Sequence, residues 1–180
     1  SKTLNRATDT TRQPGSTFKI LAAYSAALDA GGLTLASVQD DAPYTYAGAN
    51  GKSVNNYDRR YRGFTTLREA ITDSINIVTV KTLAQAGVSL GWQYVQEYGF
   101  TTVDSRDMNE ALALGGITQG VSNLELTAAY AAIANQGTYI KPKFYTKILD
   151  HDGNVLIDNT TPESHTVIKD TTAWLLTSAM

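Results

Sequence analysis

The sequence predicts a mainly α-helical fold with one small β-hairpin, and three observations support this prediction. Several segments carry apolar residues at helical spacing and stop at a glycine. Two Ser/Thr-x-x-Glu capping boxes each precede such a segment. A hydrophobic content of 42% in 180 residues is enough for the core of one globular domain, and no internal repeat divides the chain.

The first predicted helix spans residues 16–30. Its apolar run begins at Phe18, and Gly31-Gly32 should end it, because glycine readily takes the left-handed conformation of a helix C-terminus. Residues 40–63 follow as a predicted loop, in which proline, glycine and asparagine gather.

The first capping box, Thr66-Leu67-Arg68-Glu69, predicts a short helix that gives way near Asp73. Helical spacing resumes over Ile77–Ala86 and stops at a glycine. Ser89 is then the predicted N-cap of a helix that continues to Tyr98.

The second capping box, Ser122-Asn123-Leu124-Glu125, predicts a helix over Asn123–Asn135. Val121 and Leu126 are spaced to form a hydrophobic staple across its first turn. Four residues at helical spacing should face the core. They are Leu126, Ala129, Tyr130 and Ile133.

The periodicity changes to two after this helix. Phe144–Leu149 and Val155–Ile157 flank the turn residues His151-Asp152-Gly153-Asn154, which predicts a β-hairpin. Asp170 is the predicted cap of a last helix that continues through Leu176.

Composition argues against several classes of function. Without cysteine, neither a disulfide framework nor a thiolate metal site can form. His151 and His165 match no helical metal motif, so we expect them on the surface. The net charge of −2 disfavours nucleic-acid binding, and the basic cluster of Arg59, Arg60 and Arg62 is expected to be a solvated loop.

The ends of the chain suggest a piece of a larger protein. No apolar run reaches the ~18 residues that a membrane-spanning helix requires. The chain opens on Ser1 without a methionine and stops at Met180 inside an apolar helical pattern. We therefore expect residues 1–180 to be a partial domain, truncated at both ends, with membrane attachment only through missing parts of the parent protein.

Arg12-Gln13-Pro14-Gly15-Ser16-Thr17-Phe18-Lys19 carries the strongest chemical signal. Ser16 and Lys19 are three residues apart and so lie on one face of a helix. Ser16 also falls in the first turn, where unpaired N–H groups and the helix dipole stabilise negative charge. A weak nucleophile and an amine that can act as its base are thereby combined. Lys19 would be a base only as the neutral amine, which requires burial or a second positive charge to lower its pKa.

Ser74-Ile75-Asn76 supplies a second hydroxyl and an amide at a break between helices. The Ser74 hydroxyl is a candidate relay for a proton between Lys19 and a leaving amine, and the Asn76 amide is a candidate anchor for a substrate peptide bond. Ser53-Val54-Asn55 repeats the pattern within the predicted loop. We favour the later motif, because helices on both sides would hold it rigidly.

Gly115-Gly116 and Gly120 predict a tight loop between helices. A phosphate cradle is disfavoured there, because no Lys-Ser/Thr pair follows and no strand clearly precedes it.

These motifs, in this order, resemble the transpeptidase domain of class A (bifunctional) penicillin-binding proteins. That family carries Pro-Gly-Ser-x-x-Lys, then Leu-Arg-Glu-Ala followed by Ser-x-Asn, and later a Gly-Val-x-x-Leu-Glu helix that ends in Ala-Asn-x-Gly. This chain matches with Pro14–Lys19, Leu67–Ala70, Ser74–Asn76, Gly120–Glu125 and Ala134–Gly137. The matches cover nearly the whole chain.

The resemblance implies that Ser16 is the acylated nucleophile, Lys19 its base, Ser74 the proton relay and Asn76 the substrate-amide anchor. Ser16 would attack the D-Ala-D-Ala bond of a peptidoglycan stem peptide, release D-Ala and pass the acyl group to an amine of a neighbouring stem. β-Lactam antibiotics mimic that dipeptide and would acylate the same serine. The resemblance implies no metal or organic cofactor, no nucleic-acid partner, and a place on the extracytoplasmic face of the bacterial membrane.

One departure concerns the family's third motif, Lys-Thr/Ser-Gly on a strand at the edge of the cleft. Lys81-Thr82 is followed by Leu83 within a helical pattern, so the motif is missing from this sequence. The resemblance therefore implies the helical part of the penicillin-binding protein and serine β-lactamase-like α+β fold, with most of the central sheet missing. An isolated chain of this kind should be inactive or weak.

Two other functions stay open. A serine β-lactamase shares Ser-x-x-Lys but needs a second base to hydrolyse the acyl-enzyme, for which Glu110 and Glu125 are the candidates. A non-catalytic binding or sensor module on the same scaffold would account for the missing third motif.

Overall fold

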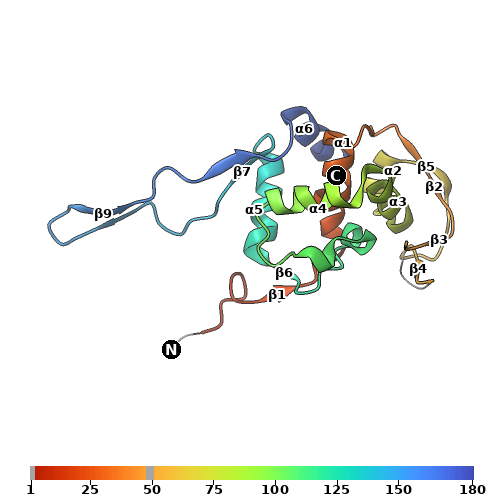
Figure 1. The fold of residues 1–180 in the computed structure, drawn as a ribbon. Helices are drawn as coiled ribbons and strands as arrows, with labels where there is room; N and C mark the ends of the chain where they lie inside the picture. Colours follow the sequence, from red (N-terminus) through yellow and green to blue (C-terminus); the bar gives the residue numbers. More distant parts are fainter. Residues whose placement is uncertain (1–2, 48–50) are drawn as a thin grey trace.

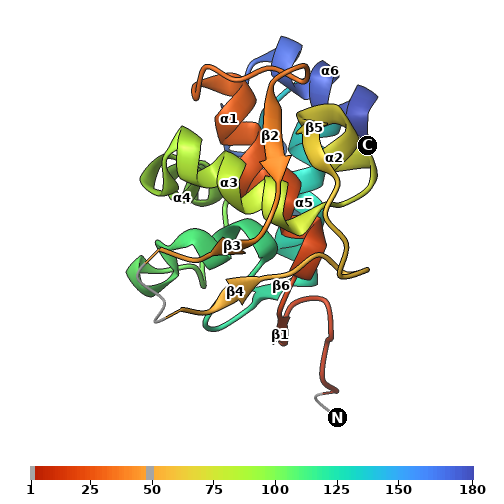
Figure 2. The ribbon, with the colours of Figure 1, turned by 90° about the vertical axis from the view of Figure 1, so that its right-hand side faces the viewer.

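The computed structural model describes residues 3–47 and 51–180, and a long β-hairpin projects from a body of helices (Figure 1). Within these residues the helices pack around one central helical run, and short two-stranded sheets lie beside them (Figures 1 and 2). The predicted mainly helical fold with a hairpin agrees with this architecture, although more strands form than were predicted.

The central run is helical throughout but changes geometry along its length. It consists of the 3₁₀-helix η1 (Gly15–Thr17), the π-helix η2 (Ile20–Tyr24) and α1 (Ser25–Asp29). The predicted helix over 16–30 is thus right in place, but only part of it is α-helical. Every residue from Phe18 to Ala27 is buried, so packing on all sides, rather than one apolar face, determines the geometry of the run.

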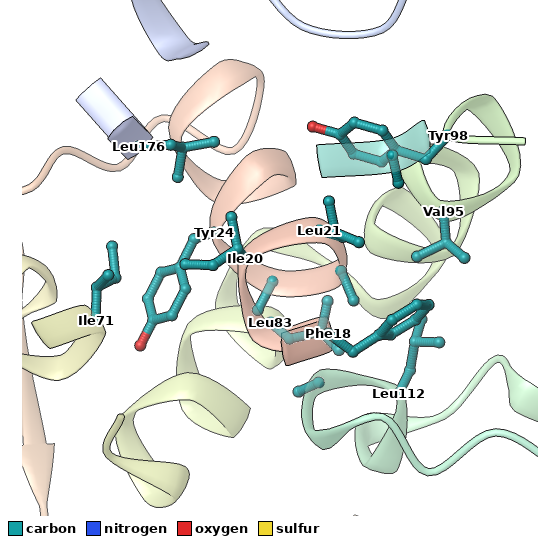
Figure 3. Packing of buried hydrophobic residues seen from close by; sticks show 14 of the residues in the cluster. Phe18, Ile20, Leu21, Tyr24, Ile71, Leu83, Val95, Tyr98, Leu112 and Leu176 are labelled. Carbon is teal, nitrogen blue, oxygen red and sulfur yellow. The ribbon is translucent and has the colours of Figure 1, made fainter. Parts of the chain in front are cut away.

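The other helices surround this run, and their apolar side chains complete the core. They are α2 (Leu67–Thr72), α3 (Asn76–Ala86), α4 (Val88–Glu97), the 3₁₀-helices η3 (Ser105–Asp107) and η4 (Glu110–Leu114), α5 (Asn123–Ala134) and α6 (Asp170–Ala179). Figure 3 shows Leu83, Val95, Leu112 and Leu176, from four of these helices, around the central run.

Both predicted capping boxes are confirmed. The side chains of Thr66 and Ser122 accept hydrogen bonds from the backbone N–H groups of Glu69 and Glu125, whose carboxylates accept from the cap residues in return. The helices that they begin, α2 and α5, therefore start where the sequence predicts. The predicted inward face of α5 is also confirmed, since its four residues are buried or partly buried against the core.

Two other predicted caps are wrong by one or two residues. Gly87 is the N-cap of α4, so Ser89 lies inside the first turn. Lys169 has the extended backbone of an N-cap, and Asp170 is the first residue of α6. Small polar and acidic residues favour both the cap and the first turn, which explains both errors.

The strands form antiparallel pairs. The pairs are β1 (Thr11–Arg12) with β6 (Val121–Ser122), β2 (Val38–Asp41) with β5 (Gly63–Thr66), β3 (Tyr44–Thr45) with β4 (Ser53–Val54), β7 (Thr138–Ile140) with β10 (Ser164–Thr166), and β8 (Lys147–Leu149) with β9 (Val155–Asp158).

The predicted loop over 40–63 is right for most of the described residues of this stretch, but residues of the short strands β2 to β5 interrupt it. These strands are two to four residues long, too short for alternation to stand out in the sequence. Residues 48–50, including Gly48, lie outside the described residues.

The predicted hairpin is confirmed as β8–β9, which projects from the helical body in Figure 1, but its first strand begins at Lys147 and not at Phe144. Gly153, with φ of 86°, forms its turn, a conformation that favours glycine. Strands β8 and β9 are exposed along their whole length.

Candidate active site

Long-range contacts fix the backbone ahead of Ser16. The Gln13 amide donates to the carbonyl of Ile117 and accepts from its N–H at 2.9 Å. Gly115 packs so closely on Gly15 that a Cβ at Gly115 would lie 2.6 Å from the backbone N and O of Gly15. The tight loop predicted around Gly115 is thus confirmed, and these contacts determine where the central helical run begins.

Ser16 lies in the first turn of that run and is exposed. Its Oγ has no hydrogen-bond partner within residues 3–47 and 51–180, so it is free to meet a ligand. Phe18 anchors the turn in the core, since it is fully buried and packs edge-to-face on Phe100 with ring centroids 5.0 Å apart. The Tyr130 hydroxyl donates to the carbonyl of Thr17 at 2.6 Å.

Lys19 is only 3% exposed, and its ammonium group contacts the second predicted motif directly. Nζ donates to the Ser74 carbonyl at 2.6 Å, to Ser74 Oγ at 2.9 Å and to Asn76 Oδ1 at 2.6 Å. The structure therefore brings together three of the four predicted site residues across more than fifty residues of sequence, with Ser16 one turn before Lys19 on the same helical run.

Burial lowers the pKa of Lys19 from 10.5 to about 8. A neutral amine has two N–H groups and one lone pair, so one of its three contacts must change when Lys19 loses its proton. The Ser74 carbonyl and Asn76 Oδ1 can only accept, whereas the Ser74 hydroxyl can reverse and donate. Protons can thus pass between Lys19 and Ser74 without any movement of the backbone.

Ser74 terminates α2 in an unusual backbone conformation. Its φ is 53°, in the left-handed region that favours glycine. The N–H of Ser74 donates to the Ile71 carbonyl and that of Ile75 to the Ala70 carbonyl, at 3.1 and 2.9 Å, which is the Schellman pattern of a helix end. A serine thus occupies the position where glycine is usual, and its hydroxyl reaches Lys19.

Asn76 is the first residue of α3, and its half-buried carboxamide already makes two contacts. Oδ1 accepts from Lys19, and Nδ2 donates to the carbonyl of Asn55 at 2.7 Å. The remaining N–H of Nδ2 has no partner in the described part of the chain and can donate to a ligand carbonyl.

The competing Ser53-x-Asn55 motif plays a different part, because Ser53 and Val54 pair in a sheet and Asn55 contributes only its backbone carbonyl.

The two candidate second bases are occupied elsewhere. Glu110 accepts from the Tyr44 hydroxyl and the Ala47 N–H, both at 2.9 Å. Glu125 accepts from Ser122, in the capping box, and from Thr101.

Other residues that the sequence singled out lie on the surface. His151 and His165 are exposed, as predicted, and so are all three arginines of the basic cluster at 59, 60 and 62. Lys81 lies on α3 and donates to the Asp40 carbonyl at 2.6 Å, in agreement with its helical pattern.

No group of three or more histidine, aspartate or glutamate side chains in the described residues is arranged to bind a metal ion. Of the helices in the described part, none has the length and apolar character for crossing a membrane.

Sequence reasoning missed two residues that shape this site. Gln13 contacts the backbone of Ile117, and Asn56 accepts from the backbone N–H groups of Asn76 and Ile77. Both act through contacts with backbone distant in the sequence, for which a single sequence carries no periodic signal.

A family model described as the penicillin binding protein transpeptidase domain matches residues 1–180. Penicillin-binding protein 1F of Bacillus subtilis is 40% identical over 177 residues, which cover 98% of this chain and 24% of that protein. Penicillin-binding protein 1A of Neisseria flavescens is 41% identical over 160 residues, or 86% of this chain and 19% of that protein. The chain thus spans about a quarter or less of the length of these relatives.

Solved structures agree with this match. Penicillin-binding protein 1A from Haemophilus influenzae superposes with a TM-score of 0.84 at 30% identity, covering 98% of this chain and 30% of that chain. The imipenem acyl-enzyme complex of penicillin-binding protein A from M. tuberculosis has a TM-score of 0.85 at 23% identity, covering 98% and 44%, and shows the shared fold.

Proposed function

Because the chain belongs to the family of penicillin-binding protein transpeptidase domains, we propose that it is part of a longer serine D,D-transpeptidase that cross-links peptidoglycan stem peptides. One observation carries the proposal: the buried amine of Lys19 donates to both Ser74 and Asn76. Such a three-group arrangement beside an unpaired serine hydroxyl suits acyl transfer through a covalent intermediate.

In the proposed first step, Ser16 Oγ attacks the carbonyl of the penultimate D-Ala, and its proton passes to the neutral amine of Lys19. Ser74 donates its hydroxyl proton to the nitrogen of the terminal D-Ala and takes the proton held by Lys19 in return. D-Ala leaves as a free amino acid, and Ser16 keeps the acyl group as an ester. Asn76 holds the substrate amide through its unpaired N–H.

In the second step, an amine of a neighbouring stem peptide attacks the ester carbonyl. A new peptide bond forms and the bond to Ser16 Oγ breaks. The proton that the attacking amine loses passes through Ser74 to Lys19, and from Lys19 to Ser16 Oγ. β-Lactams enter at the first step, because their strained amide presents a carbonyl to the same nucleophile. These steps need no metal ion or organic cofactor.

The proposed substrate also implies a cellular location for the protein. Peptidoglycan stem peptides are joined outside the cytoplasm, so we place the domain on the extracytoplasmic face of the bacterial membrane, attached through parts of the parent protein outside these 180 residues. We also propose that residues 1–180 form only part of the transpeptidase domain, since the Lys-Thr/Ser-Gly motif is absent from the sequence.

The test is release of D-Ala from a donor pentapeptide, with and without an acceptor amine, by the full-length protein. We expect release that depends on Ser16 and a cross-linked product when the acceptor is present. The hydrogen bonds that already occupy the carboxylates of Glu110 and Glu125 argue against a β-lactamase. Rapid turnover of a chromogenic cephalosporin, without D-Ala release, would reverse that assignment.

A further inference from the structure

Asn56 holds the backbone of α3 at the point where Asn76 begins it. The Asn56 side chain is buried, at 4% exposure. Its Oδ1 accepts from the N–H of Asn76 at 3.1 Å and from the N–H of Ile77 at 3.2 Å. The N-cap of α3, Ile75, has no polar side chain, so Asn56 supplies from another segment the acceptor that α3 lacks.

A buried carboxylate determines which way the Asn56 amide points. Nδ2 donates to both oxygens of Asp41, at 2.8 and 3.0 Å, and to the Arg60 carbonyl at 2.8 Å. Asp41 is fully buried, and it also accepts from the N–H of Arg62 at 2.9 Å. Asp41 can only accept, so it fixes the nitrogen of Asn56 toward itself and the oxygen toward α3.

The neighbouring residue contacts the side chain of Asn76. The Asn55 carbonyl accepts from Asn76 Nδ2, which leaves Oδ1 directed at Lys19. Residues 55 and 56 thus fix both the backbone and the carboxamide of Asn76.

We propose that Asn56, oriented by Asp41, is a positioning residue that sets the place of Asn76 and, through Asn76 Oδ1, of the Lys19 amine. This inference rests on the proposed function, in which Asn76 and Lys19 act on the substrate. Asn56 itself acts only through α3.

The test measures acylation of the full-length protein by a fluorescent penicillin across pH. Asn56→Ala should acylate about 10–100-fold more slowly, because small displacements of catalytic groups are costly in rate. The pH at half-maximal rate should also fall, because Lys19 loses an acceptor that stabilises its ammonium form. A role in stability alone would change the amount of folded protein and leave that pH unchanged.

Two further variants make the comparison specific. Asp29→Ala is a control at the far end of the central run, about 15 Å from Lys19 along the helix. It removes the carboxylate that accepts a hydrogen bond from the N–H of Lys169. It should destabilise the fold without changing the pH dependence. The exchange Asp41→Asn with Asn56→Asp keeps an acceptor for the α3 N–H groups and a donor between the pair, but it removes the donor to the Arg60 carbonyl. It should therefore recover only part of the acylation rate that Asn56→Ala loses.

Folded Asn56→Ala that acylates at the parent rate with an unchanged pH dependence would overturn the inference alone. If Asn56→Ala does not fold, Asn56→Ser decides, because its shorter side chain cannot reach both Asp41 and the N–H groups of α3. Slow acylation with a lowered pH of half-maximal rate supports the inference, and parent-like acylation overturns it. A parent protein that is never acylated would remove the proposed function and this inference together.

Discussion

At the scale of single residues, the proposed chemistry depends on Lys19, whose amine is buried in the protein and not exposed to water. Lys19 has three acceptors within hydrogen-bond reach, which favour its charged form, yet burial lowers its pKa to about 8. A substantial fraction of the neutral amine is therefore present near physiological pH, which an exposed lysine would not provide.

The rate of acylation should follow this titration. Below about pH 8 the neutral amine decreases tenfold per pH unit, so acylation by a fluorescent penicillin should slow by the same factor and reach a plateau above that pH. Lys19→Met should not acylate at any pH. A rate independent of pH between about 6 and 9 would argue that Lys19 is not the base.

The backbone of Ser74 allows a second test. Ser74→Gly and Ser74→Ala both remove the hydroxyl, so both should slow acylation to the same extent. They should differ in stability, because a left-handed φ of 53° suits glycine and not alanine. We expect the glycine variant to be more stable to urea by about 1 kcal/mol. Equal stability of the two variants would contradict the left-handed backbone conformation of Ser74. Normal acylation by either variant would contradict the role of Ser74 as a proton relay.

The four proposed site residues can be identified as candidates from the sequence, because each stands in a short local motif. Ser16 and Lys19 share a helix turn, and Ser74 and Asn76 flank a helix break. The partnership of Lys19 with Ser74 and Asn76 follows from the resemblance and not from any spacing. Asn56 and Gln13 could not be predicted, because an isolated amide in a loop has no pattern that reports its distant partner.

At the scale of elements, prediction succeeds where side chains act locally and fails where packing decides. The two capping boxes involve residues three apart, and both helices begin as predicted. The central run is buried from Phe18 to Ala27, and its π-helical segment has no local signature. The short strands β2 to β5 are stabilised by pairing across the sheet, which residue order alone does not reveal.

The crossing of α4 over the central run should tolerate no side chain at Gly91. A Cβ there would lie 2.5 Å from the Ala22 carbonyl oxygen and 2.3 Å from Leu83 Cδ1. Gly91→Ala should therefore destabilise the protein by about 2 kcal/mol or more in thermal or urea unfolding.

Ser89→Ala is the matched control on the same helix. Ser89 is exposed and lies inside the first turn, so this change should alter stability by no more than about 0.5 kcal/mol. A loss of about 1 kcal/mol would instead indicate that Ser89 is the N-cap after all. An unchanged stability of Gly91→Ala would contradict the close crossing of the two helices.

At the scale of the whole molecule, the proposed site joins the start of the central run to the break between α2 and α3, and distant loops support both. The chain spans 24% of one relative and 19% of another, and the Lys-Thr/Ser-Gly motif of the family is not in its sequence. Loss of a single oxyanion donor costs ~10²–10³ in rate, so we expect the isolated 180-residue chain to acylate slowly if at all.

The most direct measurement is mass spectrometry of the full-length protein after brief incubation with penicillin, with the acylated peptide sequenced. We predict a single adduct on Ser16 that is absent from Ser16→Ala, while the variant stays folded. An adduct on another side chain, or an unmodified Ser16 peptide in protein that releases D-Ala, would contradict the account.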